Sequence, residues 1–235
     1  MELKNKRIIV TGGSDGIGRH ICLKLAAVGT RLAILGRDAD RLAGVEAECI
    51  AAGASEAIGI ACDIQNPDAI SGAVEQVTAA FGGLDILINN AGIWHKTGPL
   101  DEIPPQLLQA TVQTNLTGLM QITQAAIPAL RANDEGIILN VVSKSGVVAQ
   151  AGQSVYTATK YGVRGFTEVL KADEENTGVR VGGVYQSGTN TGMFSKAGED
   201  VPNHIFTEPD DLADVVVFVL SRPPKLWIHD IRIEL

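Results

Sequence analysis

Aromatic residues make up only 4% of this 235-residue chain, and cysteine occurs three times. Cys22, Cys49 and Cys62 are an odd number with no metal-like spacing, so we interpret them as free thiols in a reducing, cytoplasmic compartment. No apolar run approaches the ~18–20 residues of a membrane span. The apolar stretch near the N-terminus is also too short for a signal peptide, so we expect no membrane partner.

Clusters of basic residues are missing as well, and the formal net charge is −8 with a pI near 5.0. Proteins that follow a phosphate backbone carry such clusters, so we expect no nucleic-acid partner. The hydrophobic fraction of 45% is enough for a substantial core, and the length suits one large α/β domain or two small ones. The lack of a linker or repeat favours one domain over residues 1–235.

Short β-branched runs alternate with longer amphipathic stretches along the chain. Strands are predicted at 7–11, 31–35, 57–63, 84–90, 136–142, 179–184 and 226–233. Helices are predicted at 16–28, 38–52, 67–81, 104–130, 152–175 and 209–220. The strands are apolar on both faces, as in parallel sheets that helices cover. The pattern predicts an α/β fold with one doubly wound, parallel, seven-stranded, Rossmann-like sheet and helices on both faces.

Residues 186–207 depart from this alternation, because they are rich in Gly, Ser, Thr and Asn and include Pro202. A long loop inside a compact domain is usually functional or mobile. This one follows the carboxyl end of a predicted strand, which is where ligands bind in open α/β sheets. We therefore expect a lid over a substrate pocket.

The turn between the first strand and the first helix carries Gly12, Gly16 and Gly18, with Ser14 and Ile17 between them. Glycines here let the backbone bend tightly and approach a pyrophosphate, which the helix N-terminus also favours. The spacing GxxxGxG differs from the commoner GxGxxG fingerprint, and a plain glycine-rich turn is the alternative. The position between a strand and a helix favours dinucleotide binding.

The second strand ends in Gly36, Arg37 and Asp38. NAD-binding domains usually place an acidic residue at this strand end for the ribose 2′-hydroxyl. An arginine instead suits the 2′-phosphate of NADP, and Asp38 is expected to cap the next helix. NADP is therefore the preferred cofactor with NAD still possible, and a solvated surface arginine is the alternative.

Two further strand ends should lie on the same rim of the sheet. Asp63, with Ile64 beside it, could bond the adenine amino group after the third strand. After the fourth strand, the run Asn89-Asn90-Ala91-Gly92 offers small residues where a ribose would lie. Asn90, Ala91 and Gly92 are therefore candidate cofactor contacts, and ordinary turn residues are the alternative.

The candidate chemistry lies in Tyr156, Lys160 and Ser143. Positions i and i+4 share one face of a helix, so the phenol and the ammonium can point into one pocket. A phenol has a reference pKa near ~10, and an adjacent cation is expected to lower that pKa. With Ser143 sharing a substrate oxygen, the groups could move a proton to or from a carbonyl. A surface i, i+4 pair on the helix is the alternative.

Together these motifs resemble the short-chain dehydrogenase/reductase family over nearly the whole chain. The resemblance rests on TGGSDGIG at 11–18, Asp63, NNAG at 89–92, Asn115, Ser143 and YTATK at 156–160. It implies that Tyr156 is the acid/base, that Lys160 lowers its pKa and holds the nicotinamide ribose, and that Ser143 orients the carbonyl. It further implies that Asn115 bends its helix and holds a water near Lys160.

The family resemblance also places Thr189 and Thr191 against the nicotinamide carboxamide. Gln186 and Ser187 stand where the family usually has Pro-Gly, so we expect altered cofactor affinity or loop order. The C-terminal LWIHDIRIEL lacks the glycine-rich tail of many 3-oxoacyl-carrier-protein reductases. It looks more like the branch of hydroxy-acid and general carbonyl reductases.

Substrate contacts are expected from residues near this site. Trp94 and His95 follow the NNAG turn, and a surface aromatic loop is their alternative. The other candidates are Gln150, Gln153, Met193 and Phe194, of which the last two could simply anchor the loop. Trp227 is assigned to the last strand, in the core or at a subunit interface.

The sequence therefore predicts an NADP(H)-dependent oxidoreductase that interconverts a carbonyl and a secondary alcohol. A non-catalytic nucleotide sensor or scaffold on the same fold is the alternative, and a sugar-nucleotide epimerase is more remote because it needs a larger substrate domain. By family likeness, segments 104–130 and 152–175 should pair between subunits, which predicts a homodimer or homotetramer. The partner is a small carbonyl or alcohol.

Overall fold

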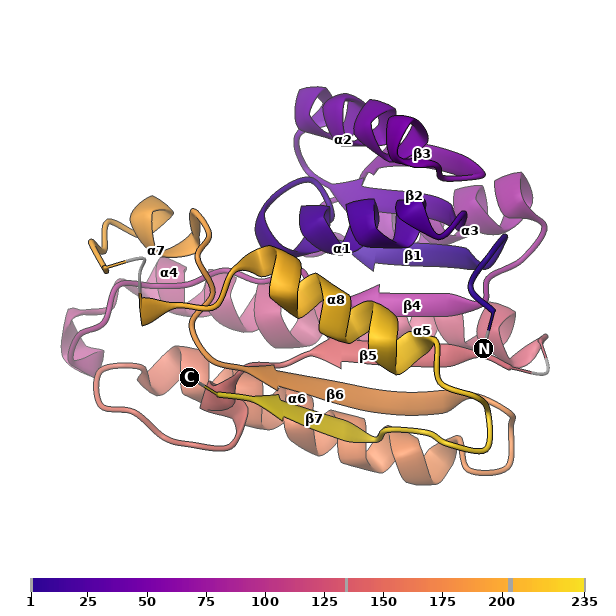
Figure 1. Cartoon of the computed structure of the whole chain (residues 1–235). Helices are drawn as coiled ribbons and strands as arrows, with labels where there is room; N and C mark the ends of the chain where they lie inside the picture. Colours follow the sequence, from indigo (N-terminus) through magenta and orange to yellow (C-terminus); the bar gives the residue numbers. More distant parts are fainter. Residues whose placement is uncertain (1, 134, 203–204, 235) are drawn as a thin grey trace.

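The computed structural model describes residues 2–133, 135–202 and 205–234 (Figure 1). Its centre is one parallel sheet in the order β3-β2-β1-β4-β5-β6-β7. The strands are β1 (Arg7–Thr11), β2 (Arg31–Gly36), β3 (Glu56–Ala61), β4 (Ile86–Asn89), β5 (Ile137–Val141), β6 (Arg180–Gln186) and β7 (Asp230–Ile233). The order reverses between β1 and β4, which creates the crevice where such sheets bind ligands.

Helices cover both faces of this sheet, as the sequence predicted (Figure 1). One face carries α1 (Gly16–Ala27), α2 (Ala39–Ala52) and α8 (Pro209–Leu220). The other carries α3 (Pro67–Phe81), α5 (Leu119–Arg131) and α6 (Ser154–Asp173). The remaining elements are α4 (Pro105–Val112), α7 (Met193–Lys196), the π-helix η2 (Gln113–Gly118) and two short 3₁₀ turns, η1 (Leu100–Glu102) and η3 (Lys144–Gly146).

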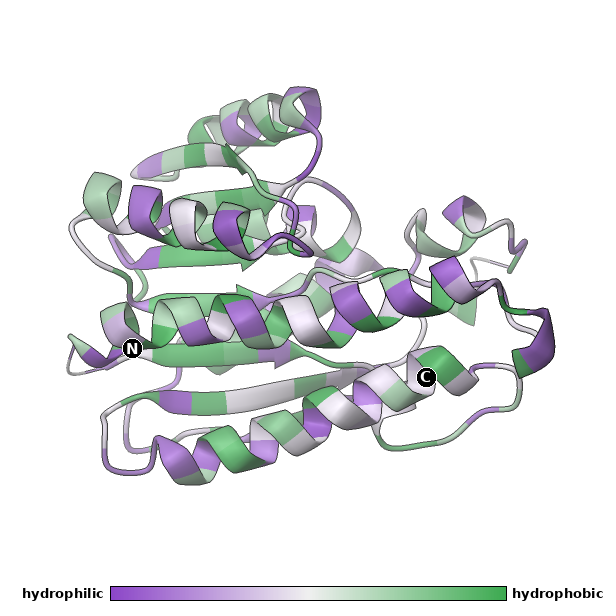
Figure 2. Ribbon diagram, turned by 180° about the vertical axis from the view of Figure 1, so that it is seen from behind, coloured by the Kyte–Doolittle hydropathy of each residue, from purple (hydrophilic) through white to green (hydrophobic). Residues whose placement is uncertain are grey.

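Alternation along each strand divides the core into two layers. Ile8 and Val10 of β1 pack with α1, α2 and α8, whereas Ile9 between them packs with α3, α5 and α6. All three are fully buried. Figure 2 shows strands that are mostly hydrophobic and helices in which hydrophobic and hydrophilic residues alternate. Because both sides of the strands are apolar, the sheet needs helices on both faces.

Side-chain caps begin the helices near the crevice. Asp38 caps α2 by accepting a hydrogen bond from the backbone N–H of Arg41 at 3.1 Å, as predicted. Asn66 caps α3, whose first residue is Pro67, by accepting from the N–H of Asp68 at 3.0 Å. Asp15 accepts from the N–H of Gly16 at the start of α1. These caps define where the turns above β1, β2 and β3 end.

Several boundaries differ from the sequence prediction. The single helix expected at 104–130 is α4, η2 and α5 in succession, because a π-turn interrupts the α-helical bonding at Asn115. The strand expected at 226–233 contains only β7, and Trp227 precedes it, donating its indole N–H to the Val181 carbonyl at 2.9 Å. β3 ends at Ala61, before Asp63.

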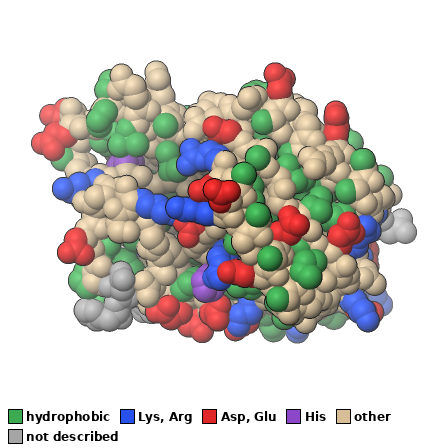
Figure 3. Space-filling model, turned by 90° about the horizontal axis from the view of Figure 1, so that it is seen from above, with side chains coloured by type: hydrophobic (Ala, Val, Ile, Leu, Met, Phe, Trp, Pro, Cys, Tyr) green, Lys and Arg blue, Asp and Glu red, His purple; other side chains and the backbone are tan. Residues whose placement is uncertain are grey.

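The segment 186–207 contains the short helix α7, where only a loop was predicted. Residues 203 and 204 of that segment lie outside the described residues. No helix in the described part of the chain is long and apolar enough to cross a membrane. On the face seen in Figure 3, basic and acidic side chains are interspersed rather than gathered by sign.

Candidate active site

A cleft of about 1360 Å³ opens at the carboxyl ends of the central strands. Pockets for one small molecule usually occupy ~300–1,000 Å³, so this cleft has room for a dinucleotide and a second molecule. Nearly all residues predicted from the sequence line it: Gly12, Ser14, Gly16, Ile17, Arg37, Asp63, Ile64, Asn90, Ala91, Gly92, Trp94, Ser143, Gln150, Gln153, Tyr156, Lys160, Thr189, Thr191 and Met193. Gly18 and Asn115 lie behind the lining.

The glycine turn is shaped as a cradle. Gly12 has φ +63°, and a Cβ there would lie 2.9 Å from the Cα of Ala91. A Cβ on Gly18 would lie 2.2 Å from the Gly12 carbonyl oxygen, so Gly18 lets α1 pack against the turn rather than lining the cleft. The start of α1 lines the cleft at Gly16 and Ile17, and a helix N-terminus in this position favours a pyrophosphate.

The end of β2 excludes an acidic side chain at position 36. A Cβ on Gly36 would lie 2.7 Å from the hydroxyl oxygen of Ser14. Asp38, two residues further along, accepts a hydrogen bond from the backbone N–H of Arg41 and forms a 3.3 Å ion pair with its side chain. Arg37 is exposed, lines the cleft and makes no ion pair with a described residue. Positive charge is therefore available where a ribose 2′-substituent would lie.

The two asparagines at the end of β4 have different roles. Asn90 lines the cleft and donates through Nδ2 to the Thr11 carbonyl at 2.9 Å. Asn89 is 1% exposed and donates to Thr123 and to Asn140, each at 2.8 Å. The prediction that Asn89 lies near a ribose is therefore wrong, because alternation in β4 turns its side chain toward the helices.

Asp63 lies two residues beyond β3 and still lines the cleft. One carboxylate oxygen accepts a hydrogen bond from the backbone N–H of Gln65 at 3.0 Å. This local turn holds the carboxylate at the far end of the cleft from Tyr156. The geometry leaves its other oxygen available to a donor such as an adenine amino group.

Asn115 is fully buried within the π-turn. Its Oδ1 accepts from the N–H of Ile93 at 2.7 Å, and its Nδ2 donates to the Ile93 carbonyl at 2.8 Å. Both ends of the amide therefore clamp the loop that follows β4. A π-turn of this kind often lies at a functional site, and here it supports the wall of the cleft beside Gly92, whose Cβ would lie 3.4 Å from the Asn115 Oδ1.

Ser143 follows β5 in a conformation that side chains rarely adopt, with φ +135°. Its hydroxyl accepts a hydrogen bond from the N–H of Ser145 at 3.1 Å. A non-glycine residue at such a φ costs ~1–3 kcal/mol and persists only where the surroundings enforce it. The turn aims the hydroxyl into the cleft, toward Tyr156.

Tyr156 and Lys160 are both almost buried, at 7% and 5% exposed. Burial raises the pKa of Tyr156 to about 12, and a hydrogen bond with Ser143 opposes that shift. Burial also lowers the pKa of Lys160 to about 8. The ammonium lies 5.5 Å from the centre of the phenol ring and donates to the Val141 carbonyl at 3.3 Å.

The expected lowering of the phenol pKa by Lys160 is therefore wrong for this structure. The ammonium donates to the Val141 carbonyl instead of the phenol, and burial raises the pKa of Tyr156. At neutral pH the phenol is protonated, which is the form that can donate a proton.

His95 is a buried support for Tyr156 rather than a surface residue, with 1% exposure. Its Nε2 accepts a hydrogen bond from the backbone N–H of Tyr156 at 3.3 Å, and its Nδ1 lies 3.0 Å from the Lys96 carbonyl oxygen. With Nε2 as the acceptor, Nδ1 is the ring nitrogen that can donate to the Lys96 carbonyl. The residue before α6, Gln153, supplies no side-chain cap, and His95 takes that role for one N–H.

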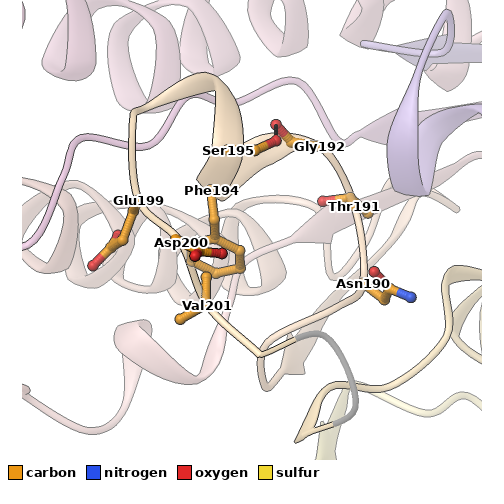
Figure 4. Close-up of a pocket in the computed structure, with 8 residues that line it drawn as sticks. All are labelled: Asn190, Thr191, Gly192, Phe194, Ser195, Glu199, Asp200 and Val201. Carbon is orange, nitrogen blue, oxygen red and sulfur yellow. Dashed lines mark hydrogen bonds between the residues drawn. The ribbon is translucent and has the colours of Figure 1, made fainter.

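The segment 186–202 lines the cleft and contacts distant parts of the chain. The indole N–H of Trp94 donates to Glu199 at 2.6 Å, and Lys196 pairs with Asp15 at the glycine turn. Phe194 points from α7 into a hollow bounded by Val201 (Figure 4). These contacts tie the expected lid to both the cofactor side and the Tyr156 side of the cleft.

Gln186 and Ser187, which stand in place of Pro-Gly, also line the cleft. Gln186 ends β6 and is 8% exposed, and its Oε1 is buried without a hydrogen-bond partner among the described residues. An unsatisfied buried oxygen costs ~1–3 kcal/mol. The structure thus places an unused acceptor beside Thr189, in the region assigned to the nicotinamide.

Sequence reasoning missed Glu199, Phe206, Lys196, Arg41 and Asp15 as cleft residues. Asp15 lies between Ser14 and Gly16, and Arg41 lies four residues after Arg37, so their proximity to predicted contacts was a usable signal. The first three lie in the 186–207 segment, where nothing in the sequence indicates which side chains turn inward. The described residues contain no group of three or more His, Cys, Asp or Glu that could hold a metal ion.

The fold and the cleft define a dinucleotide-binding α/β enzyme, and comparison with known proteins specifies its family. A family model described as short chain dehydrogenase matches residues 6–202. The chain belongs to the short-chain dehydrogenase/reductase family of oxidoreductases.

Individual relatives agree with this assignment. The chain is 32% identical over 245 residues to a D-beta-hydroxybutyrate dehydrogenase of Cupriavidus necator, covering 95% of this chain and 93% of the relative. A short-chain dehydrogenase from Burkholderia cenocepacia, solved in complex with NADP, is 34% identical with a TM-score of 0.87, covering 100% of this chain and 98% of that one. A metagenomic short-chain oxidoreductase, also solved with NADP, is 33% identical with a TM-score of 0.86, and both chains are covered completely.

We expect His95→Ala to lower kcat about tenfold or more, because small displacements of a reacting group reduce rates strongly. KM for the cofactor should not change, since His95 does not line the cleft. His95→Gln, which offers an amide oxygen to the same N–H, should restore most of the turnover. Steady-state kinetics would show this split, with His20→Ala as the control, because His20 pairs with Asp210 of α8 and does not line the cleft.

Equal losses in the alanine and glutamine variants would mean that the hydrogen bond to Tyr156 is not what His95 contributes. Full activity in His95→Ala would remove the supporting role altogether. Circular dichroism on each variant distinguishes a displaced Tyr156 from an unfolded helix.

Proposed function

We propose that this protein is an NADP(H)-dependent oxidoreductase that interconverts a carbonyl and a secondary alcohol. The observation that carries the proposal is the convergence of Ser143, Tyr156 and Lys160 in one cleft with a glycine cradle. Tyr156 and Lys160 are also nearly buried. A nucleotide sensor would have no use for a protonated phenol and a buried ammonium beside the cofactor.

The residues suggest separate roles in reduction. Ser143 donates its hydroxyl proton to the substrate carbonyl oxygen and holds it near Tyr156. The pKa of Tyr156, raised to about 12, keeps the phenol protonated until the carbonyl oxygen becomes an alkoxide. An alkoxide is more basic than a phenolate, so the proton passes to it. Lys160, charged below its pKa of about 8, then stabilises the phenolate.

The cleft has the features that a nicotinamide dinucleotide requires. Gly12 and the start of α1 would hold the pyrophosphate, Asp63 the adenine, and Thr189 and Thr191 the carboxamide. When bound, the cofactor supplies or accepts the hydride. The free acceptor on Gln186 would offer the carboxamide a further partner in place of the family's usual Pro-Gly backbone.

A preference for NADP is supported by the end of β2. Gly36 cannot carry an acidic side chain against Ser14, and Arg37 is exposed there without an ion-pair partner among the described residues. A guanidinium makes charge-assisted hydrogen bonds to phosphate oxygens. Relatives solved with NADP are consistent with this choice.

We expect Tyr156→Phe to reduce kcat for ketone reduction by ~10²–10⁴-fold, the usual contribution of a positioned acid. The hydroxyl is the only atom lost, so NADPH affinity should stay within a few-fold. We expect turnover to be lost while NADPH binding, measured by its fluorescence, is retained. Full activity in this variant would refute the mechanism and would leave the sensor alternative standing.

Arg37→Ala should raise KM for NADPH by ~10–100-fold and leave KM for NADH nearly unchanged. The estimate follows from ~1.5–3 kcal/mol for a hydrogen bond to a charged group. Arg19→Ala, an arginine paired with Glu48 outside the cleft, is the matched control. Parallel loss of both cofactors in Arg37→Ala would show that this side chain does not read the 2′-phosphate.

We also propose a homodimer or homotetramer that pairs α5 and α6 with their copies. Tyr161 and Val169 on α6 are 42% and 59% exposed, and Gly165 between them leaves open space on the same face. Light scattering should show an assembly that Val169→Glu weakens and Ile50→Glu, on α2, leaves intact. A wild-type mass of 24.7 kDa alone would contradict the assembly.

The proposed partner is thus a small carbonyl or alcohol, with neither nucleic acid nor membrane, in the cytoplasm. The mixed surface charge and the three buried thiols support this setting. Cell fractionation that recovers the protein with membranes would contradict it.

A further inference from the structure

Aromatic side chains are concentrated in one half of the cleft. The chain has two Trp, three Tyr and five Phe, and four of these ten, Trp94, Tyr156, Phe194 and Phe206, line the cleft. Their rings form a continuous row of contacts. The ring of Trp94 meets Tyr156 edge-on at 4.6 Å and Phe194 edge-on at 5.2 Å, and Phe194 stacks on Phe206 at 5.1 Å.

This cluster joins three separate parts of the chain around the reacting phenol. Trp94 comes from the loop after β4, Tyr156 from α6, Phe194 from α7, and Phe206 from the stretch just before α8. In Figure 4 the ring of Phe194 points inward from α7. Edge-on and offset contacts are those that aromatic rings prefer, so a flat ring entering here would find complementary surfaces beside the Ser143 and Tyr156 hydroxyls.

Charge in the same half of the cleft is unfavourable to anions. Glu199 lines the cleft and accepts from the Trp94 indole, which keeps the carboxylate beside the rings. Asp200 lines the adjoining hollow. The basic side chains that line the described cleft are Arg37, Arg41, Lys144, Lys160 and Lys196.

None of these cations is free for a substrate carboxylate. Arg37 and Arg41 lie at the β2 end, with the cofactor. Lys144 faces Glu234 at 3.4 Å, and Lys196 pairs with Asp15. Lys160 is buried and bonds the Val141 carbonyl.

We propose that the substrate is an uncharged carbonyl compound carrying an aromatic or conjugated ring, and that Trp94, Phe194 and Glu199 determine this choice. The inference rests on the proposed carbonyl–alcohol function. In the reaction, the carbonyl carbon gains a hydride with two electrons from NADPH, and the oxygen gains a proton from Tyr156, which solvent replaces. Keto acids and thioesters of acidic carriers are disfavoured by Glu199.

The test compares three ketones that differ in one feature each, by NADPH oxidation. The probes are 1-phenyl-2-propanone, 1-cyclohexyl-2-propanone and the phenyl compound with a para carboxylate. A methylene separates ring from carbonyl, so intrinsic reactivity is matched. We expect kcat/KM for the phenyl ketone to exceed that for the cyclohexyl ketone about fivefold, as aromatic pairing implies. The carboxylate should be slower by about fivefold or more, from like-charge repulsion.

Two variants assign these preferences to residues. Phe194→Leu should bring the phenyl and cyclohexyl ketones close to equal, whereas Phe218→Leu on the outer side of α8 should preserve the wild-type ratio. Glu199→Gln retains an acceptor for the Trp94 indole and should raise the relative kcat/KM of the carboxylated ketone. A wild-type enzyme that reduces the cyclohexyl or the carboxylated ketone as fast as the phenyl ketone would overturn the inference.

Ligand binding separates this inference from the proposed function. In a Trp227→Phe background, Trp94 is the remaining tryptophan, and its fluorescence should be quenched by the phenyl ketone at lower concentration than by the other two. If no ketone is reduced but this order is seen, the proposed chemistry fails and the ring preference stands. If neither reduction nor quenching discriminates among the ketones, the ring preference fails.

Discussion

The burial of Tyr156 and Lys160 beside each other is the constraint around which the site is built. Both groups lose hydration in this position. The loss raises the pKa of the Tyr156 phenol to about 12 and lowers the pKa of the Lys160 ammonium to about 8. Access of water would return both pKa values toward those of the free side chains. The fold therefore has to hold α6 against the sheet and keep the cleft covered.

Several contacts hold α6 in that place. Thr167 in the middle of the helix accepts a hydrogen bond from the buried Asn140 of β5 at 2.8 Å. At its start, His95 accepts from the Tyr156 backbone. Gly146 allows the turn after β5 to approach closely, because a Cβ there would lie 3.0 Å from the Lys160 carbonyl oxygen. Packing and polar contacts thus act together on the helix that carries the chemistry.

Local features of the chain were readable before the structure. The glycine turn, the Asp38 cap and the i, i+4 pair depend on backbone geometry over a few residues, and the structure places each as expected. The side-chain directions of Asn89 and His95 were not readable, because they depend on where a strand ends and which helix lies opposite. The pKa direction of Tyr156 was wrong for a related reason, since burial is a property of the assembled fold.

The alternation of strands and helices, the cofactor turn and the identity of the groups that can carry protons all follow from the order of residues along the chain. Hydrophobic periodicity and glycine positions affect the backbone over a few residues, so their consequences can be predicted without knowing the fold. Only the tertiary structure decided which groups meet: the Trp94–Glu199 bond, the aromatic cluster and the support of Tyr156 by His95. The His95–Tyr156, Trp94–Tyr156 and Trp94–Glu199 pairs are separated by 61 to 105 residues, and only the sheet order and the segment 186–207 bring them together.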